Sequence, residues 1–382
     1  MRGFIIRMGL IGILMALLAA SVGAQDSKWE NISASLLDGL EGYSDDIPGA
    51  RRFGAVMVDR HTGDVLAGLH GKPFGVYRSS DAGKTWSRFD DGIIDGGWQR
   101  SFCMRQDLDK PGRMAFFTTS PPAKENKPTS AMTLDGGKSW IQFADPFAFQ
   151  GQGGWRHGMV DWSQDPVHII AQNRIRPKLQ ISVDNGKEFK PAPGKIAGVM
   201  DPNFNLTYIR AKEPANYERY LKGQVEGYGL YQGNIIFGEH DGIEVSIGED
   251  GEMQKVADFI VTAYTPVLFD GKLYWGSEKG VIMSDDAGKT WSLMGSELPM
   301  VRKGPYIGAD ANNMVVVAES GVFHTSDGGK NWKKLTDLFK VPDAWRADEG
   351  PVWLRTNYAW DHTRNILYVT GLAGSLYKME VK

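Results

Sequence analysis

One short sequence pattern recurs along this chain and constrains its fold more than any other feature. The pattern reads Ser or Thr, any residue, Asp, then Ala, Gly or Asn, then Gly, Lys, any residue, and Trp or Phe. Five copies begin at Ser79, Thr133, Ser182, Ser284 and Thr325, and a worn copy occupies residues 246–251. Five matches to one eight-residue pattern indicate repeated structural units.

Each copy has the composition of a tight turn between two strands. Its Asp carboxylate can accept hydrogen bonds from backbone N–H groups and from the Ser or Thr hydroxyl, and its Gly suits a positive φ. The aromatic residue that follows begins a strand and packs into the core. Two β-rich runs precede each copy, as at Met314–Ala318 and Gly321–Thr325, and a short one follows, as at 332–335. The repeat unit is therefore predicted to have four antiparallel strands, with the Asp turn joining the third to the fourth.

This pattern resembles the Asp-box (BNR) repeat shared by sialidases, bacterial-type xyloglucanases, sortilin-like receptors and a photosystem-assembly factor. The resemblance covers essentially the whole chain after residue 24 and implies a β-propeller. Propeller-type polysaccharide lyases and sialidases are the related enzymes, and the assembly factors are non-catalytic. The sialidase match is incomplete, because residues 50–54 lack the Phe/Tyr-Arg-Ile-Pro motif of those enzymes and the nearest string, 174–177, lies in the third unit.

The count of repeat units predicts the size of the ring. Six units end near Asp90, Phe143, Pro191, Ala257, Met294 and Leu335. A seventh begins near residue 357 and ends without an Asp turn, whereas residues 26–32 look like the tail of a repeat. We expect the N-terminal strand to complete the last blade, because closing the ring leaves no open sheet edge. The predicted fold is an all-β, seven-bladed β-propeller with about 51 residues per blade, and six blades is the alternative.

The N-terminal segment has the features of an export signal. Arg2 and Arg7 form a positively charged start, the apolar run Met8 to Ala20 follows it, and small residues continue up to Ala24. We therefore predict a signal peptide over residues 1–24, a single propeller domain over 25–382, and a secreted or periplasmic location. The formal net charge of −3 argues against a nucleic-acid partner. The chain has one cysteine, Cys103, which excludes a disulfide framework and a multi-cysteine metal site. We also predict a monomer with no cofactor, no metal and no membrane contact after cleavage of the signal peptide.

The two faces of such a ring carry different loops. The Asp turns lie on one face, and the loops between second and third strands lie on the other, together with the blade-to-blade linkers. We expect a site on the latter face, at the mouth of the channel, where the innermost strands begin. The arginines and tryptophans predicted to bind substrate there are Arg52, Trp98, Arg100, Trp155, Arg156, Arg174, Trp353 and Arg355. Guanidinium groups bind carboxylate or sulfate, which points to an acidic oligo- or polysaccharide; alternatively, the arginines pair with carboxylates and the tryptophans wedge between blades.

Candidate catalytic residues map to the same face. They are His157, Tyr217, Glu239, His240, Glu278 and Glu319, of which Tyr217 belongs to a long insertion expected to form a lid or cleft wall. A glycoside hydrolase needs a carboxylic acid together with a second carboxylate. A polysaccharide lyase needs an arginine against the uronate carboxylate and a His or Tyr to remove the C5 proton. The sequence thus predicts a secreted carbohydrate-active enzyme, and the alternative is a non-catalytic propeller that binds glycan or protein.

Overall fold

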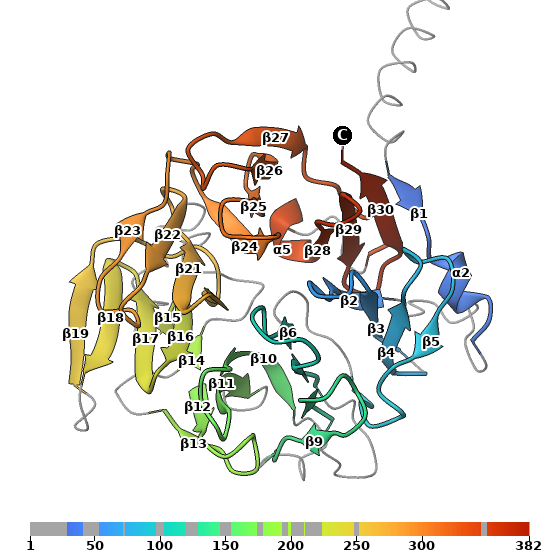
Figure 1. Ribbon diagram of the computed structural model, residues 1–382, viewed down its shortest axis with the longest axis horizontal. Helices are drawn as coiled ribbons and strands as arrows, with labels where there is room; N and C mark the ends of the chain where they lie inside the picture. The colour runs from blue at the N-terminus through green and yellow to red at the C-terminus, as the bar shows by residue number, and fades with distance from the viewer. Residues whose placement is uncertain are drawn as a thin grey trace, which may run out of the picture.

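Seven four-stranded antiparallel sheets stand as blades around a central axis in this computed structural model (Figure 1). The structure describes residues 29–40, 53–71, 73–96, 103–119, 129–145, 154–173, 179–192, 198–199, 210, 224–247, 252–344 and 350–381. The prediction of an all-β, seven-bladed propeller is therefore confirmed. Residues 1–24, the predicted signal peptide, lie outside the described residues.

The first four blades follow one another along the chain, each from its innermost strand outward. Blade 1 contains β2 (Phe53–Val58), β3 (Val65–Leu69), β4 (Gly75–Ser79) and β5 (Ser87–Arg88). Blade 2 contains β6 (Met104–Gln106), β7 (Met114–Phe116), β8 (Ala131–Thr133) and β9 (Ile141–Gln142). Blade 3 contains β10 (Trp155–Asp161), β11 (His168–Asn173), β12 (Leu179–Ser182) and β13 (Lys190–Pro191). Blade 4 contains β16 (Gly227–Tyr231), β17 (Asn234–Glu239), β18 (Gly242–Ile247) and β19 (Glu252–Ala257).

The remaining elements complete the ring. Blade 5 contains β20 (Val267–Phe269), β21 (Lys272–Gly276), β22 (Val281–Ser284) and β23 (Ser292–Leu293). Blade 6 contains β24 (Val301–Ile307), β25 (Met314–Ala318), β26 (Gly321–Thr325) and β27 (Lys333–Thr336). Blade 7 contains β28 (Thr356–Asp361), β29 (Ile366–Gly371), β30 (Leu376–Glu380) and β1 (Glu30–Asn31). Two short helices, α2 (Ala34–Leu37) and α5 (Val352–Arg355), and a parallel pair, β14 (Gly198–Val199) with β15 (Gln224–Val225), lie between the blades in sequence.

The N-terminal strand closes the ring, as the sequence predicts. In blade 7, β1 pairs antiparallel with β30, so that Glu30 lies opposite Lys378 and Asn31 opposite Tyr377. The backbone N–H of Ile32 extends this pairing by donating to the carbonyl oxygen of Leu376 at 2.9 Å. The first and last strands of the described chain are therefore neighbours in one sheet (Figure 1).

The five Asp turns have the hydrogen bonding expected of them. In the first turn, Asp81 Oδ1 accepts from the Ser79 hydroxyl at 2.8 Å and from the Thr85 backbone N–H at 2.9 Å. The same carboxylate accepts from the Thr85 hydroxyl at 2.6 Å, and Gly83 has the positive φ of 87°. Equivalent bonds occur around Asp135, Asp184, Asp286 and Asp327. Each carboxylate accepts hydrogen bonds from residues of its own turn, which supports a structural role for these Asp residues.

Protonation of the carboxylates in the Asp turns is expected to lower the stability of the fold at acid pH. Hydrogen bonds from the side chains of Ser139 and Asn331 are the main reason that the pKa values of Asp135 and Asp327 fall to about 2. An unfolded Asp titrates near ~3.9, so the stabilising contribution is complete above that value and is lost as the pH falls towards 2. We expect the difference in melting temperature between wild type and Asp135→Asn to be constant above pH ~5 and to shrink below pH ~4. Circular dichroism melts across that range measure it, and a difference independent of pH would contradict this assignment.

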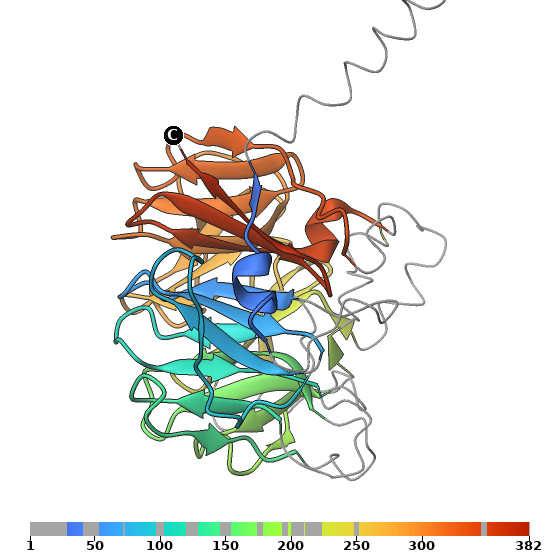
Figure 2. The ribbon, with the colours of Figure 1, turned by 90° about the vertical axis from the view of Figure 1, so that its right-hand side faces the viewer.

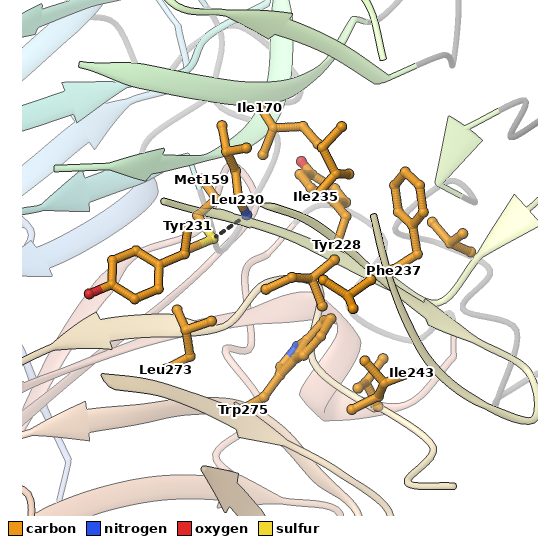
Figure 3. Close-up of a cluster of buried hydrophobic side chains, with 14 of the residues drawn as sticks. Met159, Ile170, Tyr228, Leu230, Tyr231, Ile235, Phe237, Ile243, Leu273 and Trp275 are labelled. Atoms are coloured by element: carbon orange, nitrogen blue, oxygen red, sulfur yellow. Dashed lines mark hydrogen bonds between the residues drawn. The ribbon is translucent and has the colours of Figure 1, made fainter. Parts of the chain in front are cut away.

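The hydrophobic core lies between adjacent blades. One cluster joins Met159 and Ile170 of blade 3 to Tyr228 of blade 4 and Trp275 of blade 5 (Figure 3). Within it, the Leu230 backbone N–H donates to the sulfur of Met159 at 3.4 Å, the dashed line of Figure 3. Such interdigitated packing fixes each sheet relative to the next and holds the inner strands at the channel.

The two faces of the propeller differ in their loops (Figure 2). One face, here called the turn face, carries the Asp turns and the hairpins that follow the inner strands, and the C-terminal end of β30 lies there. The opposite face, here called the linker face, carries α5 and β14 and the beginnings of the inner strands. Among the described residues, no helix has the length and apolar character needed to span a bilayer.

Candidate functional site

Several predicted site residues lie outside the described residues. They are Arg52, Trp98, Arg100, Arg174 and Tyr217. These residues remain predictions.

The two described tryptophans of the predicted site are packed inside the protein. Trp155 is fully buried and donates from Nε1 to the carbonyl of Ala144 at 3.2 Å. Its ring lies against that of Phe189, with ring centres 4.1 Å apart and the planes tilted by 35°. Trp353 is 6% exposed, and the guanidinium carbon of Arg302 lies 4.3 Å from its ring centre. Because both indole rings face protein atoms, the geometry favours the alternative interpretation, in which these tryptophans wedge between structural elements.

His157 is also an interior residue. Its side chain is 1% exposed, its Nδ1 lies 2.7 Å from the Tyr228 hydroxyl oxygen, and its ring lies against Tyr228 and Tyr264. Burial, together with the positive charges of Arg156 and Arg105, lowers the pKa of His157 to about 3. A neutral imidazole enclosed by two phenol rings fits a packing role, so we do not retain His157 as a candidate base. The lyase interpretation loses its best-placed proton acceptor among the described residues.

The two described arginines of the predicted set do lie on the linker face. Arg156 is the second residue of β10, and Arg355 is the last residue of α5, immediately before β28. Both side chains are partly exposed. They stand on the face opposite to Asp81 and the other Asp turns, as the order of strands requires.

Glu319 forms an ion pair with Arg302, a residue outside the predicted site. The Arg302 guanidinium, whose side chain is almost fully buried, lies with Nη2 at 2.5 Å and Nε at 3.1 Å from Glu319 Oε1. The same guanidinium packs on Trp353. A comparison of the inner strands would have revealed Arg302, because it is the second residue of β24 just as Arg156 is the second residue of β10. Glu319 is therefore held in an ion pair with Arg302 in blade 6.

An arginine from the insertion contacts blade 4 on the linker face. Arg210 Nη2 donates to the backbone oxygen of His240 at 2.6 Å and lies 3.5 Å from Glu226 Oε1. Glu226 is buried, whereas His240 itself is exposed. Arg210, which lies between β14 and β15 in sequence, thus contacts the loop between β17 and β18. Neither Arg210 nor Glu226 was among the predicted site residues, although Arg210 lies in the insertion that the sequence singles out by its length.

Two of the predicted carboxyl groups, those of Glu239 and Glu278, lie in this same region. Burial, with repulsion from Glu244, Asp241 and Glu226, raises the pKa of Glu239 to about 7. Glu278 Oε2 accepts a hydrogen bond from the Ile260 backbone N–H at 2.8 Å. Burial also raises the pKa of Glu278, although backbone hydrogen bonds and the charges of Lys279 and Arg210 oppose that shift.

We call Arg210, Glu226, Glu239 and Glu278 the carboxylate site. Its members come from blade 4 and its preceding linker, from the loop between β21 and β22 of blade 5, and from the insertion. The charge of Arg210 acts on both Glu226 and Glu278. A carboxyl group whose pKa is raised to about 7 among other carboxyl groups is the arrangement found in acid–base catalysis. Within the described ranges, no group of three or more His, Cys, Asp or Glu side chains is arranged to hold a metal ion.

A separate cavity of about 150 Å³ occupies the central channel. Its walls come from the inner strands of blades 1, 2, 3, 5, 6 and 7 and from the hairpins that follow them on the turn face. The site expected from the sequence lies at the beginnings of the inner strands, whereas this cavity lies along their middle and their turn-face ends. It contains none of the residues of the carboxylate site.

Similarity to known proteins is found among solved structures. No family model and no curated protein matches the sequence. The structure is similar to YCF48 from Cyanidioschyzon merolae, with 12% identity, a TM-score of 0.41, and coverage of 93% of this chain and 99% of that chain. It is also similar to the extracellular domain of BT4673 from B. thetaiotaomicron (9% identity, TM-score 0.45, 92% of this chain and 40% of that chain). A GH74 enzyme from Niastella koreensis matches with 10% identity and a TM-score of 0.31, over 86% of this chain and 67% of that chain.

Proposed function

We propose that this protein is a carbohydrate-active enzyme of the glycoside hydrolase class, with Glu239 as its general acid. The observation that supports this proposal most directly is the environment of Glu239. Its carboxyl group is partly buried among other carboxylates and has a pKa of about 7, so that much of it is protonated at neutral pH. A hydrolase needs such a protonated acid together with a second carboxyl group, and we assign that second role to Glu278 of the carboxylate site, whose Oε2 accepts from the Ile260 backbone N–H.

The proposed reaction uses only side chains of the carboxylate site and water. Glu239 donates its proton to the glycosidic oxygen as the bond to the anomeric carbon breaks. Water attacks that carbon, and Glu278 accepts the proton that the water releases. Arg210 positions the loop that carries Glu239 by binding the carbonyl oxygen of the next residue, His240. The hydrolase is preferred to a lyase because His157 is enclosed and has a pKa of about 3.

The proposed substrate is an acidic glycan outside the cytoplasm. Arg156 and Arg355 on the linker face support the choice of an anionic sugar, together with the predicted Arg52 and Arg100. Export is inferred from residues 1–24, whose charged start and apolar run are those of a signal peptide. The mature protein then meets its substrate in the periplasm or outside the cell.

A panel of polysaccharides tests this function. The mature protein is incubated with uronate-containing, sulfated, sialylated and neutral glycans, and both reducing ends and absorbance from unsaturated products are recorded. We expect new reducing ends without unsaturated products on at least one acidic glycan. Unsaturated products would overturn the choice of a hydrolase, and no product from any glycan by a folded protein would overturn the enzyme proposal.

The second candidate is a non-catalytic propeller that binds glycan or protein on its linker face. The burial of His157 favours it, since this burial removes one candidate base from the linker face. Affinity electrophoresis with the same glycans distinguishes the two candidates. Retardation by a glycan that the wild type never cleaves supports pure binding.

A further inference from the structure

The channel cavity differs in chemistry from the carboxylate site. Its described walls contain two arginines, Arg60 and Arg105, and no Asp or Glu. Most of the other lining side chains are apolar, for example Met57, Val160 and Leu268. A cation held among low-dielectric walls produces a strong local positive potential, which attracts anions and excludes other cations.

Arg60 closes the turn-face end of the cavity. Its guanidinium donates to the carbonyl oxygens of Leu108 and Gly308, both at 2.9 Å, and of Ala309 at 2.8 Å. It also lies 4.6 Å from the ring centre of Phe269. Arg60 of blade 1 therefore ties together the hairpins of blades 2 and 6 and the inner strand of blade 5.

Arg105 supplies positive charge inside the cavity wall. From β6 it crosses to blade 3, where Nε donates to the Gly158 carbonyl at 2.7 Å, and towards blade 5, where Nη2 donates to the Thr265 hydroxyl at 2.5 Å. Burial lowers the pKa of Arg105 to about 10, so the guanidinium stays protonated at physiological pH. The charges of Asp109 and Asp310 act on Arg60, and the described groups that act on Arg105 include Tyr228, Cys103 and Tyr306.

The other polar residues in the wall are compatible with an anion. Burial raises the pKa of Tyr306 and of Tyr358, so both phenols are neutral, and burial lowers the pKa of His362. Asn357, which is 2% exposed, donates from Nδ2 to the Gly54 carbonyl at 2.7 Å, and its Oδ1 has no hydrogen-bond partner. None of these side chains places a negative charge in the cavity at neutral pH.

From this geometry we propose that the central channel is a binding site for a small monocarboxylate with an apolar body. The carboxylate is held by the field of Arg105, and the apolar part packs against the aliphatic and aromatic walls. A volume of about 150 Å³ matches a cavity that accepts a benzene ring. This site shares no residue with the carboxylate site, so the test of carboxylate binding in the channel does not depend on the proposed hydrolase activity.

Benzoate and benzamide are matched probes for this proposal, because they share size and shape and differ in charge. We expect isothermal titration calorimetry at pH 7.5 to show that the wild type binds benzoate at least tenfold more tightly than benzamide. Arg105→Met is expected to lose this preference, whereas Arg105→Lys retains most of it. Lys289→Met, which removes an exposed cation from the turn face, is expected to leave both affinities unchanged, and so is Glu239→Gln.

The comparison of the two probes does not depend on the folding of any variant. Equal affinity for benzoate and benzamide, or no binding of benzoate to folded wild type, would overturn the proposal. Ala359→Phe provides a second test, because Ala359 lines the cavity and a phenyl ring there fills it. Unchanged benzoate binding by folded Ala359→Phe would place the ligand elsewhere and refute the channel site.

Discussion

Replacement of Glu239 by Gln is expected to reduce hydrolysis of the acidic glycan by about 10²–10⁴-fold, because the amide cannot donate the proton that the leaving oxygen requires. The variant should remain at least as stable as the wild type at neutral pH. In the folded wild type the pKa of Glu239 is raised to about 7, above the ~4.3 of an unfolded Glu. Its contribution to stability is therefore complete below pH ~4 and is lost as the pH rises through 7, and Gln removes this loss.

The pH dependence of the wild type provides the accompanying measurement. Because the acid must be protonated, kcat/KM is expected to fall as the pH rises through about 7. Glu244→Gln serves as a matched variant, since Glu244 contributes the largest of the charge repulsions that raise the pKa of Glu239. That variant should shift the alkaline limb to lower pH while keeping the maximal rate. If Glu239→Gln retained full activity, or if Glu244→Gln left the limb in place, Glu239 would not be the acid.

The fold could be predicted from the sequence because the repeat is local. Each Asp turn is built from residues within one eight-residue segment, such as Ser79, Asp81 and Thr85, so its hydrogen bonds are readable without knowledge of distant contacts. The ring closure was also predictable, since residues 26–32 match the tail of a repeat that the seventh unit lacks. Both predictions depend on periodicity, which a single sequence contains in full.

The site could be predicted only in part, because burial depends on neighbours from other blades. The position of His157 at the start of an inner strand is readable from the sequence, but Tyr228 and Tyr264, which enclose it, come from blade 4 and from the linker to blade 5. Arg302 and Glu319 are 17 residues apart in sequence, and their ion pair forms across a hairpin. The pKa of Glu239 likewise depends on burial and on charges that the fold brings together. The sequence therefore shows that a Glu is present, but its raised pKa can be inferred only from the structure.

Because the N-terminal segment closes the ring, its deletion is expected to cause a large loss of stability. Deletion of residues 29–40 from the mature chain removes β1 and α2, and with them the buried side chains of Ile32, Leu36 and Leu37. Burying each such side chain contributes roughly 1.5–3 kcal/mol, so the three together contribute about 5–9 kcal/mol as an upper bound. A native domain has a total stability of only about 5–15 kcal/mol. The shortened chain is therefore expected to unfold or to associate through the exposed edge of β30.

Point variants separate the closure from a general effect of truncation. Ile32 packs on Gly83 of the first Asp turn, and Ser35 Oγ bridges the Gly83 carbonyl at 2.6 Å and the Trp86 indole N–H at 2.9 Å, so this segment joins blade 7 to blade 1. Ile32→Asp places a charge in that junction and is expected to lower the melting temperature by roughly 5–10 °C. Glu30→Gln, at an exposed position of the same strand, should change it by no more than about 1–2 °C. A synthetic peptide of residues 29–40 should restore a cooperative melt to the shortened chain, since β30 then regains its neighbour. Equal melting temperatures for Ile32→Asp and wild type would show that the blades hold together without this closure.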